Sequence, residues 1–210
     1  MAALPLAKPR LTLEDYVRIE RETGLRHEFY DGEVFAMAGG TGPHSALCVN
    51  VARHLGNALD GTDCVVYNGD LRVRCPARAP GERELNTYPD VSVVCGEPEF
   101  APPADTLLNP VLMVEVLSDS TEAYDRGAKF RLYRRIASLR EYILVAQAHR
   151  QVEVYRRGDD GAWTYHAPDP EGEPVELASV GATLAFDQIY AKTGVTSGPP
   201  SPPGPPAADF

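Results

Sequence analysis

This sequence lacks long apolar runs and closely spaced cysteine pairs, and both absences narrow the classes of protein to which it can belong. No stretch of the 210 residues approaches the ~18 consecutive apolar residues of a membrane-spanning helix. The apolar segment within residues 1–8 is too short to be typical of a signal peptide. The four cysteines form no Cys-x-x-Cys pair, which argues against a zinc site and gives no indication of an oxidising compartment. We therefore expect a cytoplasmic protein that does not contact a membrane.

Proline and glycine concentrate at the C-terminal end of the chain. Residues 194–210 hold six Pro and three Gly, with almost no large apolar side chain. Such a composition cannot bury enough surface to offset the loss of chain entropy on folding. We predict one domain over residues 1–193, followed by a disordered Pro-rich tail over residues 194–210.

The net charge of −10 is unevenly distributed along the chain. Residues 126–157 hold nine Lys or Arg against two acids, whereas residues 159–191 hold seven acids and no Lys or Arg. An acidic protein can therefore still present a basic face to nucleic acid. Two ordinary solvated surfaces would explain the same distribution, and charge alone does not separate these interpretations.

The local patterns predict a domain of mixed secondary structure. A capping threonine precedes the first helix, an Asp-Gly pair turns the hairpin, and leucine or valine recurs every four residues in the second helix. The expected elements are a helix at 12–24, a hairpin at 26–38, a helix at 43–59, strands at 63–74, 88–95 and 111–117, a helix at 121–136, strands at 141–147 and 152–156, a hairpin near Trp163 and a short helix at 186–191. Loops are expected at 79–87 and 96–109. Helices and strands alternate only in part, so we expect an α/β fold with a mixed central sheet flanked by helices.

One carboxylate, Glu115, lies in the apolar run from Val111 to Leu117. A continuous apolar run of this length is typical of a strand buried on both faces. An unpaired carboxylate there costs several kcal/mol or shifts its pKa. A partner cation, a metal ion or a catalytic role would compensate for that cost.

A second acid, Asp90, begins the valine-rich strand that follows Pro89. Two carboxylates on neighbouring strands repel one another unless a cation lies between them, and oxygen ligands favour Mg²⁺ or Mn²⁺. We therefore predict a metal site formed by Asp90 and Glu115. The alternative for Asp90 is an ordinary ion pair with an arginine at the start of a strand.

The helix after Glu115 contains a lysine that can complete this site. Lys129 shares a helix face with Asp125 and with Tyr133, because each lies four residues away. A lysine that faces the two carboxylates can stabilise negative charge on a phosphate or orient an attacking water. The alternative is a solvent-exposed ion pair between Lys129 and Asp125.

These residues resemble the PD-(D/E)XK nuclease superfamily, and more closely the Uma-two family of restriction-endonuclease-like bacterial proteins. The predicted order of helix, three strands, helix and strand is similar to the core of that superfamily. The resemblance covers roughly residues 10–192 and is specific because six stretches occur in order. They are His27–Glu33, Gly39–Ser45, Asp70–Val73, Tyr88–Val93, Val114–Thr121 and Asp125–Tyr133.

The resemblance implies a restriction-endonuclease-like fold with an N-terminal helix and hairpin and extra C-terminal strands. It also implies that Asp90 and Glu115 bind a divalent ion, Mg²⁺ or Mn²⁺, for the hydrolysis of DNA. The superfamily's lysine usually lies two residues after the glutamate, where this chain has Leu117. The Uma-two pattern is similar in placing a lysine on the helix, which implies that Lys129 takes this role.

Three further polar positions match the family pattern and have structural alternatives. His44 would lie at the mouth of the site, or would be a capping histidine at the edge of the core. Glu28 would be another carboxylate beside the metal, or a cross-strand partner of Arg26 or Lys129. Asp70 would lie near the site, or would simply begin a strand.

We therefore expect a Mg²⁺-dependent endodeoxyribonuclease, with residues 126–157 contacting the DNA backbone. The first alternative is a nucleic-acid-binding or regulatory protein that keeps the fold without turnover, which Leu117 and the acidic total favour. The second is an interaction scaffold, as a homodimer, that uses the Pro-rich tail as a partner ligand.

Overall fold

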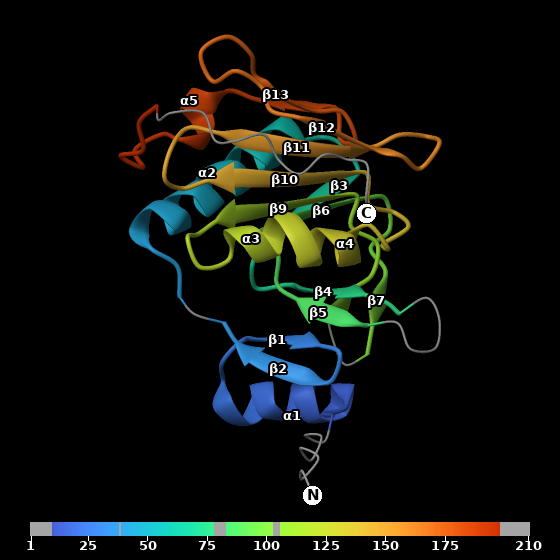
Figure 1. Cartoon of the computed structure of the whole chain (residues 1–210). Helices are drawn as coiled ribbons and strands as arrows, with labels where there is room; N and C mark the ends of the chain where they lie inside the picture. The colour runs from blue at the N-terminus through green and yellow to red at the C-terminus, as the bar shows by residue number, and fades with distance from the viewer. Residues whose placement is uncertain (1–9, 38, 78–82, 103–105, 198–210) are drawn as a thin grey trace, which may run out of the picture.

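The chain forms two six-stranded sheets, one in the upper part of Figure 1 and the second in the lower part. The structure is a computed structural model that describes residues 10–37, 39–77, 83–102 and 106–197. The main sheet has the order β12 (Trp163–His166), β11 (Val152–Arg157), β10 (Glu141–Ala146), β9 (Leu112–Leu117), β6 (Val91–Cys95) and β3 (Cys64–Asn68). The second sheet has the order β2 (Glu33–Ala36), β1 (His27–Tyr30), β5 (Leu85–Thr87), β4 (Arg72–Cys75), β8 (Thr106–Leu107) and β7 (Phe100–Ala101). A separate hairpin joins β13 (Val175–Leu177) and β14 (Ala182–Leu184).

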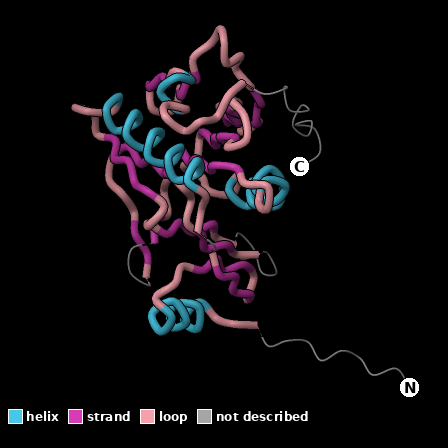
Figure 2. The backbone as a smooth tube through the Cα atoms, turned by 90° about the vertical axis from the view of Figure 1, so that its left-hand side faces the viewer, coloured by secondary structure: helices cyan, strands magenta, loops and turns pink. Residues whose placement is uncertain are grey.

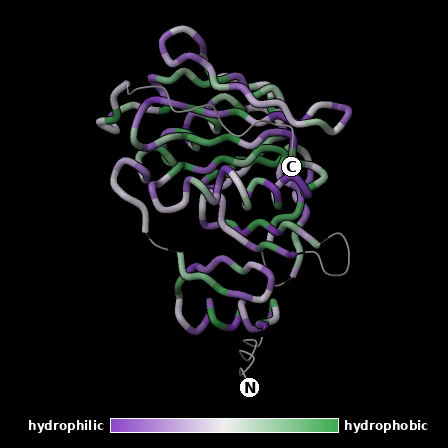
Figure 3. The backbone as a smooth tube through the Cα atoms, in the orientation of Figure 1, coloured by the Kyte–Doolittle hydropathy of each residue, from purple (hydrophilic) through white to green (hydrophobic). Residues whose placement is uncertain are grey.

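Helices cover both faces of the main sheet. On one face lie α2 (Gly42–Ala58) and α5 (Phe186–Ile189), and on the other lie the consecutive turns α3 (Glu122–Tyr124), η1 (Asp125–Lys129) and α4 (Phe130–Tyr133). The N-terminal helix α1 (Leu13–Thr23) packs instead on β1 of the second sheet. The apolar stripe of α2 packs with β6 and β9 in one core cluster, whereas α4 packs on β10 in another. In Figure 3 the hydrophobic residues concentrate in the central strands of the main sheet. The predicted α/β class, with a mixed sheet flanked by helices, is therefore confirmed.

The main sheet is mixed because one of its strand pairs is parallel. Strands β9 and β10 run parallel, with Glu115 opposite Leu144, and the helical segment from α3 to α4 connects them. The other pairs in this sheet are antiparallel. All six residues of β9 are buried, as the apolar run predicts. Glu115 therefore lies in a strand with helices on both sides.

The N-terminal helix and hairpin form as predicted and lie at the end of the molecule opposite to β11 and β12 (Figure 1). In the turned view of Figure 2, α1 is the helix at that same lower end. Thr12 and Asp15 form a capping box at the start of α1, and Gly24 ends the helix with φ 67°. Asp31 and Gly32 both have positive φ between β1 and β2, as a two-residue hairpin turn requires. These elements depend on neighbouring residues, which explains why local patterns predict them.

Gly32→Ala is expected to lower the free energy of unfolding by about 1–2 kcal/mol, because an L-residue is strained in the left-handed region. Gly32 has φ 84°, and an added Cβ would lie 2.7 Å from the Cβ of Arg10. Gly56→Ala in α2 is the matched control, since an added Cβ there meets nothing within 4 Å. We expect the control to raise stability by about 0.5–1 kcal/mol. Urea unfolding of both variants measures the difference, and equal effects would contradict the prediction.

The prediction of a single strand at 63–74 is wrong. The chain turns after β3, where the Leu71 N–H donates to the Asn68 carbonyl and the Asn68 side chain accepts from the Asp70 N–H. This turn sends β3 into the main sheet and β4 into the second sheet. The residues that form the turn, Asn68-Gly69-Asp70, are a typical turn signal inside an otherwise apolar run.

Two predicted loops contain short strands. The polar loop expected at 79–87 includes β5, and the loop expected at 96–109 includes β7 and β8. Residues 78–82 and 103–105 lie outside the described part of these loops. Strands of two or three residues carry too little periodicity to be predicted, and their partners in the second sheet stabilise them.

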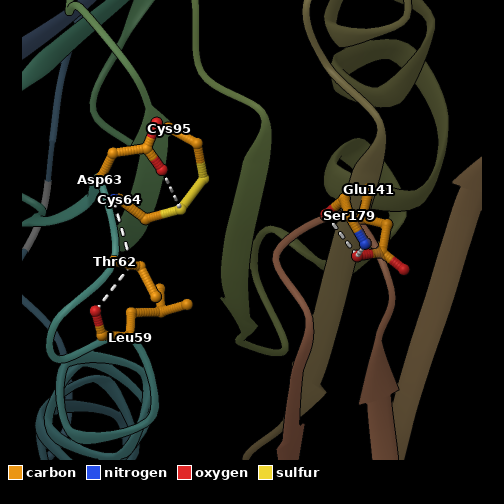
Figure 4. The surroundings of a disulfide bond; sticks show 7 residues. All are labelled: Leu59, Thr62, Asp63, Cys64, Cys95, Glu141 and Ser179. Atoms are coloured by element: carbon orange, nitrogen blue, oxygen red, sulfur yellow. Dashed lines mark hydrogen bonds between the residues drawn. A yellow bond between two sulfur atoms is a disulfide. The ribbon is translucent and has the colours of Figure 1, made fainter.

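A disulfide joins Cys64 of β3 to Cys95 of β6, which the cysteine spacing did not predict (Figure 4). The two residues are direct partners in the antiparallel register, with a Cα–Cα distance of 3.9 Å. Thr62 anchors the preceding turn by donating its hydroxyl to the Leu59 carbonyl and accepting from the Cys64 N–H. Because 31 residues separate the cysteines in sequence, only the pairing of the two strands brings them together.

The folded part of the chain continues a few residues into the predicted tail. The Arg150 N–H donates to the Thr196 carbonyl at 3.3 Å, and Val195 packs against the core. Residues 198–210, the rest of the predicted tail, lie outside the described residues. Within the described ranges, no helix has the length and apolar character needed to cross a membrane.

Candidate active site

A cleft of about 690 Å³ opens between the β1–β2 hairpin, the start of α2 and the segment from β9 to η1. Its ionisable side chains combine four carboxylates, one lysine and one histidine. They are Glu28, Asp90, Glu115, Asp125, Lys129 and His44. All five residues predicted to form the site therefore line one cleft, together with Asp125.

The pairing of β6 with β9 places Asp90 and Glu115 on adjoining strands. Val91 pairs with Val114, so Asp90 and Glu115 are the next residues on these two antiparallel strands. The Val116 N–H donates to Asp90 Oδ2 at 2.8 Å and orients this carboxylate. Burial opposes ionisation, but His44 and the Val116 N–H together lower the pKa of Asp90 below its ordinary value.

Glu115 is buried and has two close partners. Lys129 Nζ lies 2.7 Å from Glu115 Oε1, and the Tyr133 hydroxyl donates to the same oxygen at 2.6 Å. Burial raises the pKa of Glu115 from 4.5 to about 8, and the carboxylates of Asp125 and Asp90 add to this rise despite Lys129. Burial disfavours the charged form of this carboxylate, so Glu115 retains its proton near neutral pH.

Lys129 lies in η1, a single π-helical turn between α3 and α4. Such turns within helices frequently occur at functional sites. Lys129 Nζ is 3.3 Å from Asp125 Oδ1 in addition to its contact with Glu115. Burial alone would lower the pKa of Lys129, but Glu115, Asp125 and Glu28 raise it well above the ordinary value. The lysine is therefore a buried, permanently charged group aimed at Glu115, and not the solvent-exposed pair of the alternative interpretation.

His44 lies in the first turn of α2, whose N-cap is Thr41. Its Nε2 is 3.4 Å from Asp90 Oδ2, and its Nδ1 is 3.5 Å from Cys48 Sγ. The contact with Asp90 raises the pKa of His44 despite partial burial. Gly40 leaves room for this ring, because a Cβ at residue 40 would lie 2.7 Å from His44 Nδ1. His44 therefore lines the cleft and contacts one of the two predicted metal ligands.

Glu28 reaches the cleft from β1, where hydroxyl groups hold both of its oxygens. Tyr124 donates to one oxygen, and Thr87 donates to the other at 2.8 Å. Arg26, the suggested partner of Glu28, instead pairs with Asp70 at 2.9 Å. Asp70 lies in the exposed turn after β3 and does not line the cleft.

Two residues in or next to the cleft were not identified from the sequence. Cys48 follows His44 by four residues on α2 and shares its helix face, a spacing that could have indicated contact. Tyr124, which lines the cleft and binds Glu28, gives no signal of its role, because β1 and α3 are 96 residues apart at this contact.

Most cations of the basic stretch at 126–157 have partners within the protein, which limits how many of them can contact DNA. That this stretch contacts the DNA backbone stays a prediction. Arg126 pairs with Glu122 and Glu153, Lys129 with Glu115 and Asp125, Arg150 with Asp187, Arg156 with Glu141, and Arg157 with backbone carbonyls. Arg131 and Arg140 are exposed.

The side chains of the cleft fit a hard divalent cation. Asp90 and Glu115 offer carboxylate oxygens from adjoining strands, which are the ligands that Mg²⁺ and Mn²⁺ prefer. The four carboxylates of the cleft outnumber its one lysine and one histidine. Burial is the main cause of the raised pKa of Glu115 and the neighbouring carboxylates add to it, so a bound cation would favour the ionised form of this group.

Comparison with known proteins identifies the family to which this sequence is similar. Residues 13–187 match the sequence profile of the Uma2 family, described as "Putative restriction endonuclease". Two relatives from Synechocystis, the uncharacterized proteins slr1290 and sll1609, are 40% and 33% identical over 185 and 154 residues. These alignments cover 87% and 73% of this chain, and 92% and 84% of the relatives.

A crystal structure from Anabaena variabilis has a similar fold. That protein is described as "a putative nuclease belonging to DUF820", with a TM-score of 0.62 and 17% sequence identity. The match covers 80% of this chain and 90% of the other chain. At this identity the similarity establishes the fold alone, and the roles of the cleft residues have to be argued from their chemistry.

Proposed function

Because this chain belongs to the Uma2 family, whose description is of restriction endonucleases, we propose that it is a metal-dependent endonuclease that hydrolyses phosphodiester bonds of DNA. One observation carries the proposal. Asp90 and Glu115 lie on adjoining strands in a cleft, with Lys129 Nζ 2.7 Å from Glu115. The lysine that a leucine replaces at position 117 is thus supplied by η1.

Asp90 and Glu115 would hold Mg²⁺ or Mn²⁺ between them. When bound, such an ion polarises a phosphoryl oxygen and lowers the pKa of a coordinated water. As a ligand, Glu115 would be ionised, because a cation stabilises the charged form of a carboxylate and lowers its pKa. Tyr133 and Lys129 orient Glu115, and the Val116 N–H orients Asp90.

Lys129 supplies the positive charge of the protein at this site. Its ammonium group keeps its proton, so it can donate hydrogen bonds to a non-bridging phosphate oxygen and offset charge that develops during hydrolysis. Carboxylates otherwise dominate the cleft, so a phosphate entering without a cation meets net repulsion. We therefore expect DNA to enter the cleft productively only when the divalent ion is present.

The test is cleavage of supercoiled and single-stranded DNA by the folded protein with Mg²⁺ or Mn²⁺, and with EDTA as the metal-free control. We expect metal-dependent nicking that Asp90→Asn abolishes. Asp70→Asn is the matched control, because Asp70 is exposed and lies outside the cleft. Equal loss in both variants would contradict the assignment of Asp90.

If folded wild-type protein cuts neither substrate with either ion, the nuclease proposal fails. Metal-independent binding of DNA by that protein would then support the alternative of a catalytically silent binding or regulatory protein. That the protein acts in the cytoplasm, and that it is a homodimer, stay predictions from the sequence.

A further inference from the structure

Next to the proposed nuclease centre lies a second group of potential metal ligands. One ligand atom from each of His44, Cys48 and Asp90 can be chosen so that all three lie within 4.8 Å of one another. The contacts within the group are 3.4 Å between His44 Nε2 and Asp90 Oδ2, and 3.5 Å between His44 Nδ1 and Cys48 Sγ. Cys48 has no part in the proposed hydrolysis, so this group is not explained by that reaction.

The fold holds these three side chains with little freedom. His44 and Cys48 are four residues apart on α2, which puts them on one face of the helix. Asp90 is fixed at the start of β6 by the hydrogen bond from Val116. In a tetrahedral zinc site with bonds of about 2.0–2.3 Å, ligand atoms lie about 3.3–3.8 Å apart. The two printed contacts use different nitrogens of the His44 ring, whereas an ion binds one of them, so the distances that matter are those of one ligand atom per residue, which lie within 4.8 Å. Side-chain rotations that shorten them by about 1 Å would bring the group to that geometry.

The donor set differs in chemistry from the one formed by Asp90 and Glu115. A thiolate and an imidazole favour Zn²⁺ and similar ions over Mg²⁺, whereas two carboxylates favour the harder ion. Because His44 and Asp90 both line the cleft, solvent can reach an ion held there and supply a fourth ligand. Burial raises the pKa of the Cys48 thiol, so an ion at this site must displace the thiol proton.

We propose that His44, Cys48 and Asp90 form an inhibitory site for a zinc-class ion, which competes with the catalytic ion for Asp90. The inhibitory role rests on the proposed function, whereas binding of the ion to these three residues does not depend on it. Occupation would withdraw Asp90 from Glu115 and place a second positive charge beside the nuclease centre. Zn²⁺ therefore inhibits Mg²⁺-dependent cleavage when it fills this group.

The binding test uses Co²⁺, which gives a thiolate-to-cobalt absorption band when cysteine is a ligand. The measurement is made without reductant, so that Cys64 and Cys95 stay in their disulfide. The sequence has four cysteines, so only Cys48 and Cys75 can then supply a thiolate. We expect a band that saturates at one equivalent of Co²⁺, disappears in Cys48→Ser and remains in Cys75→Ala.

The same variants are titrated with Zn²⁺ by calorimetry and tested for inhibition. We expect Cys48→Ser to bind Zn²⁺ at least about tenfold more weakly. Inhibition of cleavage, expressed relative to each variant's own rate with Mg²⁺, should require correspondingly more Zn²⁺. Cys75→Ala, whose buried sulfur lies outside the group, should behave as wild type.

The outcomes separate this inference from the nuclease proposal. A cobalt–thiolate band through Cys48 in a protein that cuts no DNA would support the metal site and defeat the nuclease. Cleavage with no band in wild type, or with a band that Cys48→Ser leaves intact, would overturn the metal site and leave the nuclease standing. Zn²⁺ inhibition equal in wild type and Cys48→Ser would overturn the inhibitory role.

Discussion

Lys129→Met is expected to reduce metal-dependent DNA cleavage by about 10²- to 10³-fold, the effect of removing one group that stabilises transition-state charge. Lys129 is the one lysine that lines the cleft, and its charge is held by Glu115, Asp125 and Glu28. Methionine preserves the length of the side chain and removes the charge. The measurement is the rate of plasmid nicking per folded protein, at saturating Mg²⁺ or Mn²⁺.

The same substitution is expected to lower the free energy of unfolding by about 3–5 kcal/mol, because it leaves the buried Asp125 without its cation and Glu115 without its lysine partner. Glu115 and Asp125 both lose a partner that lies 2.7 Å and 3.3 Å away. Lys192→Met is the matched control, since Lys192 is exposed and does not line the cleft. We expect the control to leave cleavage and stability nearly unchanged.

A double variant separates the two roles of Lys129. Adding Glu115→Gln to Lys129→Met removes a buried group that ionises above its pKa of about 8, so we expect part of the lost stability to return at about pH 9. Cleavage should stay absent, because a metal ligand has also been removed. Full cleavage by folded Lys129→Met would show that the lysine is structural, and would leave Asp90 and Glu115 as the centre of the proposed enzyme.

Glu115 is expected to make the stability of the metal-free protein fall as the pH rises. The pKa of Glu115 is about 8 in the folded chain and 4.5 in its ordinary state, so the folded protein retains a proton that the unfolded protein releases. The stability from protonated Glu115 is fully present below pH 4.5 and is lost as the pH rises to about 8. Over this window the free energy of unfolding should fall by at most about 1.4 kcal/mol per pH unit.

Urea unfolding in EDTA, at pH values between about 5 and about 9, measures this dependence. Glu115→Gln cannot ionise, so its stability should fall less steeply over the same window and should gain on wild type as the pH rises. Glu153→Gln is a useful comparison, because Glu153 is a buried acid that pairs with Arg126 outside the cleft. Parallel pH profiles for wild type and Glu115→Gln would show that Glu115 is ionised throughout and would contradict the prediction.

Residues that interact with near neighbours were the ones that local patterns predicted well. The capping box of Thr12 and Asp15, the turn at Asp31-Gly32 and the apolar stripe of α2 all involve residues a few positions apart. Their energies depend on local geometry, so the rest of the chain changes them little. The apolar run around Glu115 likewise indicated burial on both faces, and β9 is buried throughout.

The errors arose where distant segments decide the outcome. The apolar residues on both sides of Asn68–Asp70 predict one strand at 63–74, whereas the two halves of this run pair with strands of different sheets. The spacing of Cys64 and Cys95 gives no sign of a bond, and only the register of β3 and β6 places them opposite each other. Charge along the sequence likewise does not show that most cations of 126–157 pair with acids and carbonyls from other elements.

The sequence by itself determined the α/β class, the capped helices, the hairpin turn and the presence of a carboxylate that its strand could not bury without compensation. Only the tertiary structure decided which groups surround and stabilise this carboxylate, Glu115. The antiparallel register brought Asp90 beside Glu115, and the π-helical turn aimed Lys129 at the same carboxylate. The physical reason is that burial and charge pairing are properties of the assembled neighbourhood, which forms from segments that are far apart in the chain.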